Sequence, residues 1–163
     1  MKTLLIISAV FPPEPVVSAK LSLDIAVEIS AIGEVVVISP KPTRPFGFKF
    51  EEKHLEFRFK HVQLNSYTCP ESNFLGRLKE SYSFGRHCFR YIAKNHSGVG
   101  LIYANSWPLL SQYYIAKASK KWDIPLIFHV QDIYPESFSN KVKFGRDFFT
   151  SLIIPFDKMN LRK

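Results

Sequence analysis

Residues 3–8 read Thr-Leu-Leu-Ile-Ile-Ser, and residues 35–39 read Val-Val-Val-Ile-Ser. Both are short, continuous apolar runs rich in β-branched side chains, which is typical of strands covered on both faces. The segment between them predicts a helix that begins at Ser18 as N-cap and stops at Gly33. Its apolar stripe consists of Leu21, Ile25, Ile29 and Ile32. A strand, a helix and a strand within about forty residues require a parallel pair joined by a right-handed crossover.

The same alternation continues along the chain. Further strands are expected over residues 57–64, 99–103 and 125–131, and helices over residues 73–96 and 108–122. Gly85 is a point where the first of these helices can be interrupted. Repeated strand–helix alternation predicts an α/β fold with an open, doubly wound, mainly parallel, Rossmann-like sheet. No linker or internal repeat divides the chain, so residues 1–163 are expected to form a single domain.

Composition narrows the classes of protein that this chain can belong to. The 163 residues are 46% hydrophobic and 15% aromatic, which excludes intrinsic disorder and suits one packed core. Lys plus Arg number 22 and Asp plus Glu number 14, and the net charge of +8 favours an anionic partner. Cys69 and Cys88 form neither a disulfide framework nor a zinc-binding spacing, which favours a reducing, cytoplasmic environment.

The loop after the first expected strand reads Phe-Pro-Pro-Glu-Pro over residues 11–15. Ligands of open α/β sheets bind at the carboxyl ends of the strands, where this loop lies. The loop lacks the glycines of a dinucleotide-binding turn, and its prolines have no N–H groups to hold a phosphate. A stiff loop that packs against an uncharged ligand or a facing domain is the favoured interpretation. A rigid surface turn without a ligand is the alternative.

The stretch over residues 125–137 is the most informative strand end in the sequence, because several polar side chains follow one another there. His129 and Gln131 fall on one face of the expected strand, and Asp132 lies at its mouth. Gln131 can donate and accept the hydrogen bonds that sugar hydroxyls require, and Glu136 can accept a proton or bind a hydroxyl. The alternatives are a satisfied, buried His129 and loop caps at Asp132 and Glu136.

Three stretches together resemble family-4 glycosyltransferases of the GT-B fold: residues 11–15, residues 33–38 and residues 129–137. Within that family, the bacterial enzymes that build capsule, O-antigen and related exopolysaccharides are the most similar group. The likeness spans nearly the whole chain, but only as the N-terminal, acceptor-side domain of such an enzyme. It implies retaining transfer of a sugar from a nucleotide-sugar donor to a growing, lipid-linked saccharide acceptor, with no metal or cofactor.

The sequence also departs from the family pattern. The position before the loop aspartate is often histidine in the family and is Gln131 here, which cannot act as a general base. The family's frequent glycine pair in the first loop is replaced by prolines. Its donor site is built mainly by a C-terminal domain, and this chain ends at Lys163 before such a domain. The chain alone is therefore expected to show no glycosyl transfer and little affinity for nucleotide sugars.

The loops and the resemblance together define the expected site. The expected catalytic residues are Gln131, Asp132 and Glu136. The expected substrate-binding residues are Phe11, Pro13, Glu14, Pro15, Lys20, Ser106, His129 and Tyr134. The expected partners are a saccharide or lipid-linked acceptor and the missing C-terminal donor domain.

The expected helix over residues 73–96 is strongly basic. The residues expected on its charged face are Lys79, Arg86, Arg90 and Lys94. The residues expected on its apolar face are Leu75, Leu78, Tyr82, Phe89 and Ile92. This pattern is typical of a membrane-surface helix and predicts contact of the four basic residues with anionic lipid at the inner face of the cell membrane.

Other interpretations of the basic helix stay open. The first is an ordinary solvated helix face. The second makes the whole chain a non-catalytic α/β subunit that anchors a separate catalytic chain to a membrane. Nucleic acid is not expected as a partner, because the sequence carries no recognition module.

Overall fold

The structure is a computed structural model that describes residues 2–43, 45, 50, 57–69, 74–105 and 108–130. The strands are β1 (Thr3–Ile7), β2 (Val35–Pro40), β3 (Lys60–Leu64), β4 (Val99–Asn105) and β5 (Leu126–His129). The helices are α1 (Val17–Ser30), α2 (Phe74–Asn95) and α3 (Leu109–Trp122), and a short 3-10 turn, η1 (His96–Gly98), joins α2 to β4.

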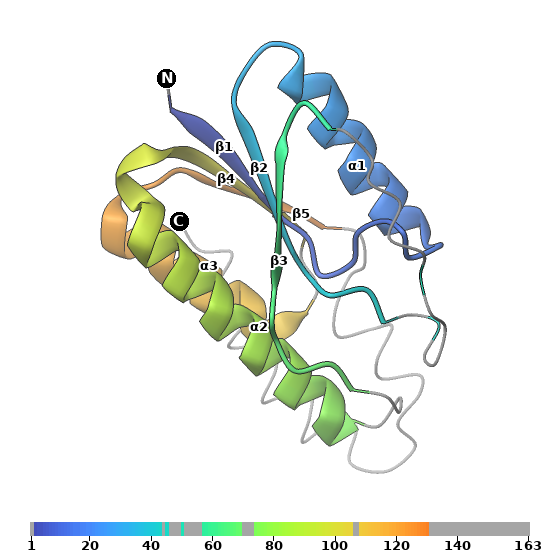
Figure 1. Cartoon of the computed structure of the whole chain (residues 1–163). Coiled ribbons are helices and arrows are strands. Elements are labelled where there is room, and N and C mark those ends of the chain that lie inside the picture. The colour runs from blue at the N-terminus through green and yellow to red at the C-terminus, as the bar shows by residue number, and fades with distance from the viewer. Residues whose placement is uncertain are drawn as a thin grey trace.

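The five strands form one parallel sheet in the order β3-β2-β1-β4-β5 (Figure 1). β1 lies at the centre, where Ile7 pairs with Ile38 of β2 on one side and Ala104 of β4 on the other. From β1 the chain adds β2 and then β3 on one side, and it then crosses to the other side of β1 to form β4 and β5. This reversal of strand order is the doubly wound arrangement. The expected α/β fold with an open parallel sheet is therefore confirmed.

Helices cover both faces of the sheet (Figure 1). α1 packs on one face, where Ile6 and Val37 are fully buried. α2 and α3 lie side by side on the other face against Leu5, Ile38 and Ile102. Because successive strand residues point to opposite faces, neighbouring residues of one strand belong to two different clusters. This double covering explains why the strand sequences are continuously apolar.

Helix α1 differs from its prediction at both ends and along its buried face. Its N-cap is Val16, in an extended conformation with no side-chain cap, so the predicted Ser18 cap is wrong. The helix also ends three residues before Gly33. Leu21 and Ile32 of the predicted stripe are exposed. The residues that α1 buries are Ala19, Ser22 and Ala26. Small side chains along this line bring the helix close to the sheet.

Helix α2 runs unbroken through Gly85, so the predicted interruption is wrong. A Cβ at Gly85 would meet the Ser111 Cα at 2.8 Å and the Tyr114 Cδ2 at 2.9 Å, and both residues belong to α3. Real Cβ atoms do not approach other heavy atoms this closely. The missing side chain therefore allows the two helices to pack closely together.

The predicted apolar face of α2 is divided between two neighbours. Tyr82 and Phe89 face α3, with ring centroids 5.7 Å from Tyr114 and 5.3 Å from Trp122. Leu75 is 77% exposed. The side chains that α2 buries against the sheet are Phe84, Cys88 and Ile92. A helix that packs on both a sheet and another helix buries more than one line of residues, and a single predicted stripe cannot represent both.

Candidate functional site

Polar side chains gather at the carboxyl edge of the sheet. Ser8 follows β1, Ser39 lies near the end of β2, Asn105 ends β4 and His129 ends β5. The register of β4 and β5 places Asn105 beside His129. In open α/β sheets this edge is where ligands bind, next to the point where the strand order reverses. The edge is therefore the candidate functional site.

The proline-rich loop after β1 is held against the sheet by its first residue. Phe11 is 3% exposed, and its ring centroid lies 6.2 Å from that of Phe59 and 4.5 Å from that of His61. Pro13 and Pro15 are exposed, and the peptide bond before Pro13 is cis. Phe11 thus anchors the loop to the core, and the prolines form its outer surface.

His61 lies beneath this loop and was not identified from the sequence. Its Nε2 lies 2.9 Å from Ser39 Oγ, and its ring contacts Phe11. Burial lowers the pKa of the imidazole below its ordinary value of 6.5, because the charged form loses hydration inside the protein. The neutral ring therefore predominates at pH 7 and joins β3 to β2 through a polar contact.

The side chain of Glu14, in the first loop, is buried rather than exposed to a ligand. Its side chain is 5% exposed, and its Oε1 accepts a hydrogen bond from the Thr43 N–H at 2.7 Å. Hydrogen bonds between a carboxylate and a backbone N–H are short and strong. Glu14 therefore ties the first loop to the segment that follows β2. Its contact with a substrate stays a prediction.

A buried network joins β1, α1 and β4 at the same edge. Ser8 Oγ donates to the Val10 carbonyl at 2.6 Å. Ser22 Oγ donates to the Ser18 carbonyl at 2.9 Å. The two hydroxyl oxygens also lie 3.0 Å apart, where either can donate to the other. Each hydroxyl has only one hydrogen, so each oxygen also serves as an acceptor. Asn105 Nδ2 supplies the donors, at 3.0 Å from Ser8 Oγ and 3.2 Å from Ser22 Oγ. The asparagine amide thus holds the start of the first loop in place.

His129 has a hydrogen-bonding partner that the sequence did not reveal. Tyr103 Oη lies 2.7 Å from His129 Nδ1. Burial raises the pKa of the Tyr103 phenol, so the phenol is protonated at neutral pH. The phenol can therefore donate to Nδ1, which would leave Nε2 directed away from this contact. This contact agrees with the interpretation of His129 as a satisfied histidine, and it keeps the ring at the carboxyl edge.

Some of the remaining predicted site residues lie in the part of the chain that the structure describes, and others lie outside it. Lys20 is exposed in the first turn of α1. The four predicted membrane-contact residues are all exposed on α2. The predicted residues that lie outside the described part of the chain are Ser106, Gln131, Asp132, Tyr134 and Glu136.

The described edge is rich in hydrogen-bonding groups that carry no net charge. They are serine hydroxyls, an asparagine amide, a tyrosine phenol and the His61 imidazole, and the Ser8, Ser39 and Asn105 side chains among them are buried. Within the described ranges no group of three or more His, Cys, Asp or Glu residues is placed to hold a metal ion. Half-buried groups at this edge, such as the Tyr103 phenol and the His129 imidazole, are the ones that can form the hydrogen bonds of a hydroxyl-rich ligand.

Comparison with solved structures finds a match in a ugt transferase from Siraitia grosvenorii, solved in complex with UDP. The TM-score is 0.50 at 15% sequence identity, over 90% of this chain and 32% of that chain. This chain thus spans about a third of the length of the protein it matches. No model of a protein family matches the sequence, and none of the curated proteins matches it. The Rossmann-like α/β fold is therefore shared with part of a glycosyltransferase.

Proposed function

We propose that this chain is the acceptor-side lobe of a glycosyltransferase and that a saccharide acceptor binds at the carboxyl edge. The main support is the first loop, which has proline at its exposed positions and a buried carboxylate in place of a phosphate cradle. The neutral hydrogen-bonding groups of the edge suit a sugar better than a nucleotide phosphate. The fold shared with the ugt transferase adds weight to this assignment.

In this proposal the nucleotide sugar binds mainly to a second lobe that faces the carboxyl edge. Gln131 hydrogen-bonds a sugar hydroxyl, and Glu136 accepts the proton that the acceptor hydroxyl loses. Asp132 orients the acceptor beside them, and His129 offers a further hydrogen bond. The reaction is a retaining transfer without a metal ion, in the family-4 manner that the sequence resembles. The acceptor is a lipid-linked saccharide of bacterial cell-surface polysaccharide synthesis, reached from the cytoplasmic side of the membrane.

Ligand-observed NMR on the 163-residue chain tests this assignment. Saturation transfer from the protein to a panel of neutral oligosaccharides is expected, and it should weaken in the His129→Ala variant. Isothermal calorimetry with UDP-glucose and UDP-N-acetylglucosamine should show little heat, because the first loop has no cradle for the pyrophosphate. Tight binding of either nucleotide sugar, with chemical-shift changes at the proline loop, would contradict the proposal.

A second candidate is a non-catalytic subunit that anchors a separate catalytic chain to a membrane. The basic outer side of α2 favours it. The two candidates differ in saccharide binding, which the acceptor-side lobe requires and an anchoring subunit does not. The NMR experiment therefore distinguishes them as well.

A further inference from the structure

Helices α2 and α3 together carry nearly all of the net positive charge of the described chain. They contain eight Lys or Arg residues and a single acidic residue, Glu80. Glu80 is 8% exposed and pairs with Arg77 at 2.7 Å, so it does not neutralise the outer side of the helices. The exposed cations are Lys79, Arg86, Arg90 and Lys94 from α2 and Lys117, Lys120 and Lys121 from α3. They are called the two-helix basic surface below.

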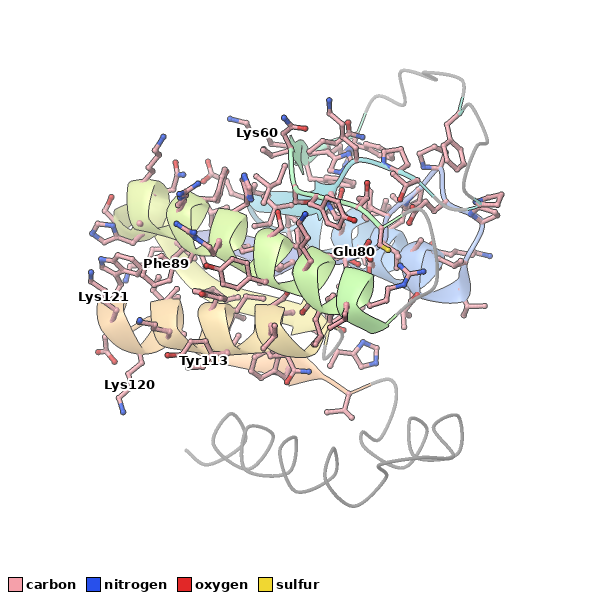
Figure 2. All side chains as sticks on the ribbon, turned by 90° about the horizontal axis from the view of Figure 1, so that it is seen from below. Lys60, Glu80, Phe89, Tyr113, Lys120 and Lys121 are labelled. Atoms are coloured by element: carbon pink, nitrogen blue, oxygen red, sulfur yellow. The ribbon has the colours of Figure 1, made fainter. Side chains whose placement is uncertain are left out.

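The packing of the two helices turns these cations to the same side of the molecule. Cys88 of α2 and Ile115 of α3 are buried against the sheet. Gly85 lets α2 approach Ser111 of α3 closely, and ring contacts between the helices lie on either side of it, at Tyr82–Tyr114 and Phe89–Trp122. The sides opposite the sheet therefore form one continuous face, along which α2 alone extends about 33 Å at 1.5 Å per residue. Figure 2 shows Lys121 of α3 beside Phe89 of α2, and the Lys121 Nζ lies 6.0 Å from the Phe89 ring centroid.

Aromatic rings lie among these cations. Four ammonium or guanidinium groups lie over a ring, at 4.5, 5.6, 5.9 and 5.0 Å from its centroid. The pairs are Lys79 with Tyr67, Arg86 with Tyr82, Lys117 with Tyr113 and Lys121 with Trp122. Tyrosine and tryptophan rings have an apolar body and a polar tip, and they favour the boundary between lipid and water. Basic and amphipathic side chains are thus combined on one face.

The opposite side of the sheet has a different character. Helix α1 carries Lys20 together with Asp24 and Glu28, and so has a small net negative charge. Among the described residues, the helices on one side of the sheet are therefore basic and the helix on the other side is not.

We propose that the two-helix basic surface docks on the headgroups of an anionic lipid bilayer, with α3 taking part as fully as α2. The face is long, positively charged and interleaved with aromatic rings, which suits a planar anionic surface. No described helix is long and apolar enough to cross a membrane, so the contact is a peripheral one. The inference extends the lipid contact that the sequence predicts for α2 to the adjacent face of α3. It does not depend on sugar transfer, because lipid binding is measured without it.

Vesicle co-flotation of the full chain tests the proposal. Vesicles of phosphatidylcholine with 30% phosphatidylglycerol should bind the protein, and pure phosphatidylcholine vesicles should not. Each Lys or Arg near an anionic leaflet contributes about fivefold to the partition coefficient. The triple variant Lys117→Gln, Lys120→Gln, Lys121→Gln should therefore lose about 100-fold in partitioning. Binding should also fall as salt is raised to 0.5 M, because salt screens exposed charges.

The matched control removes three exposed cations elsewhere, at Lys2, Arg58 and Lys60, and reaches the same net charge. The fold-loss in its partition coefficient should be less than a tenth of the fold-loss in the α3 variant, since these residues lie outside the two-helix basic surface. Equal losses in both triple variants would mean that net charge alone drives binding, and the proposal would be wrong. Equal binding to neutral and anionic vesicles, or binding to duplex DNA without binding to vesicles, would overturn it as well. Circular dichroism checks that both variants keep the fold.

Discussion

The amide of Asn105 gives the sharpest test of the carboxyl edge. Its Nδ2 donates to Ser8 Oγ and Ser22 Oγ. The hydrogens of these two hydroxyls serve the Val10 carbonyl, the Ser18 carbonyl and the contact between the hydroxyls themselves. Asn105→Asp keeps the shape of the side chain but replaces two N–H donors with an acceptor. Two buried hydrogen bonds are worth about 1 kcal/mol each, and acceptors left facing one another add about 1–3 kcal/mol. We expect the variant to lose about 3–5 kcal/mol of unfolding free energy at pH 7.

The loss should depend on pH in a known direction. The carboxyl at position 105 would be buried, so its pKa in the folded state would rise above the value of about 3.9 in the unfolded chain. The folded variant then binds more protons than the unfolded one, and its unfolding free energy falls as pH rises from about 4. Urea unfolding followed by circular dichroism at pH 4.5 and pH 7 measures both the loss and its slope.

The matched control is Asn95→Asp, which makes the same chemical change at an exposed site. Asn95 Nδ2 donates to the Tyr91 carbonyl on the surface of α2, at 2.7 Å. Water can replace that bond, so the control should lose no more than about 1 kcal/mol. A loss below about 1 kcal/mol in Asn105→Asp would refute the donor assignment, because the two hydroxyl oxygens would then not depend on the amide.

The other predictions concern helix packing and titration. Gly85→Ala should lower the unfolding free energy by about 1–3 kcal/mol, because the new methyl group would force α2 and α3 apart. Gly98→Ala is the control. A Cβ there meets nothing within 4 Å, so the unfolding free energy should change by less than about 0.5 kcal/mol. Burial lowers the pKa of His61 below 6.5, so the unfolded chain binds the proton more readily and the unfolding free energy should fall as pH falls below 6.5. His61→Gln should flatten that slope between pH 5 and 7, and an unchanged slope in chemical denaturation would show that another group is responsible.

Much of the fold could be predicted because its main signals are local. The apolar runs of β1 and β2 are long enough to mark strands covered on both faces, and proline and glycine mark the turns between elements. The details that failed depend on neighbours. Ser18 looked like a helix cap, yet the helix begins at Val17, and the Val16 carbonyl accepts from the Ala19 and Lys20 N–H groups.

The candidate site was less predictable because its contacts join distant parts of the chain. Asn105 lies 97 positions from Ser8, and neither residue carries a local signal for the other. Tyr103 sits in an apolar strand whose sequence does not reveal that the phenol meets His129. Glu14 was predicted among the substrate-binding residues, and nothing in the neighbouring sequence reveals that its side chain is buried. Its burial follows from the Thr43 N–H, which comes from a different loop.

The uneven charge of the two helix layers gives the described part of the molecule an electric dipole whose axis crosses the sheet. A negatively charged surface would exert a torque on this dipole and turn α2 and α3 toward the surface. The torque acts within the Debye length, which is about 8 Å at physiological salt. The strands would then lie flat above the surface, raised by about the 10 Å diameter of a helix. The carboxyl edge would then face parallel to the surface. A substrate anchored in that surface would have to extend from it by only about one helix diameter to reach the edge.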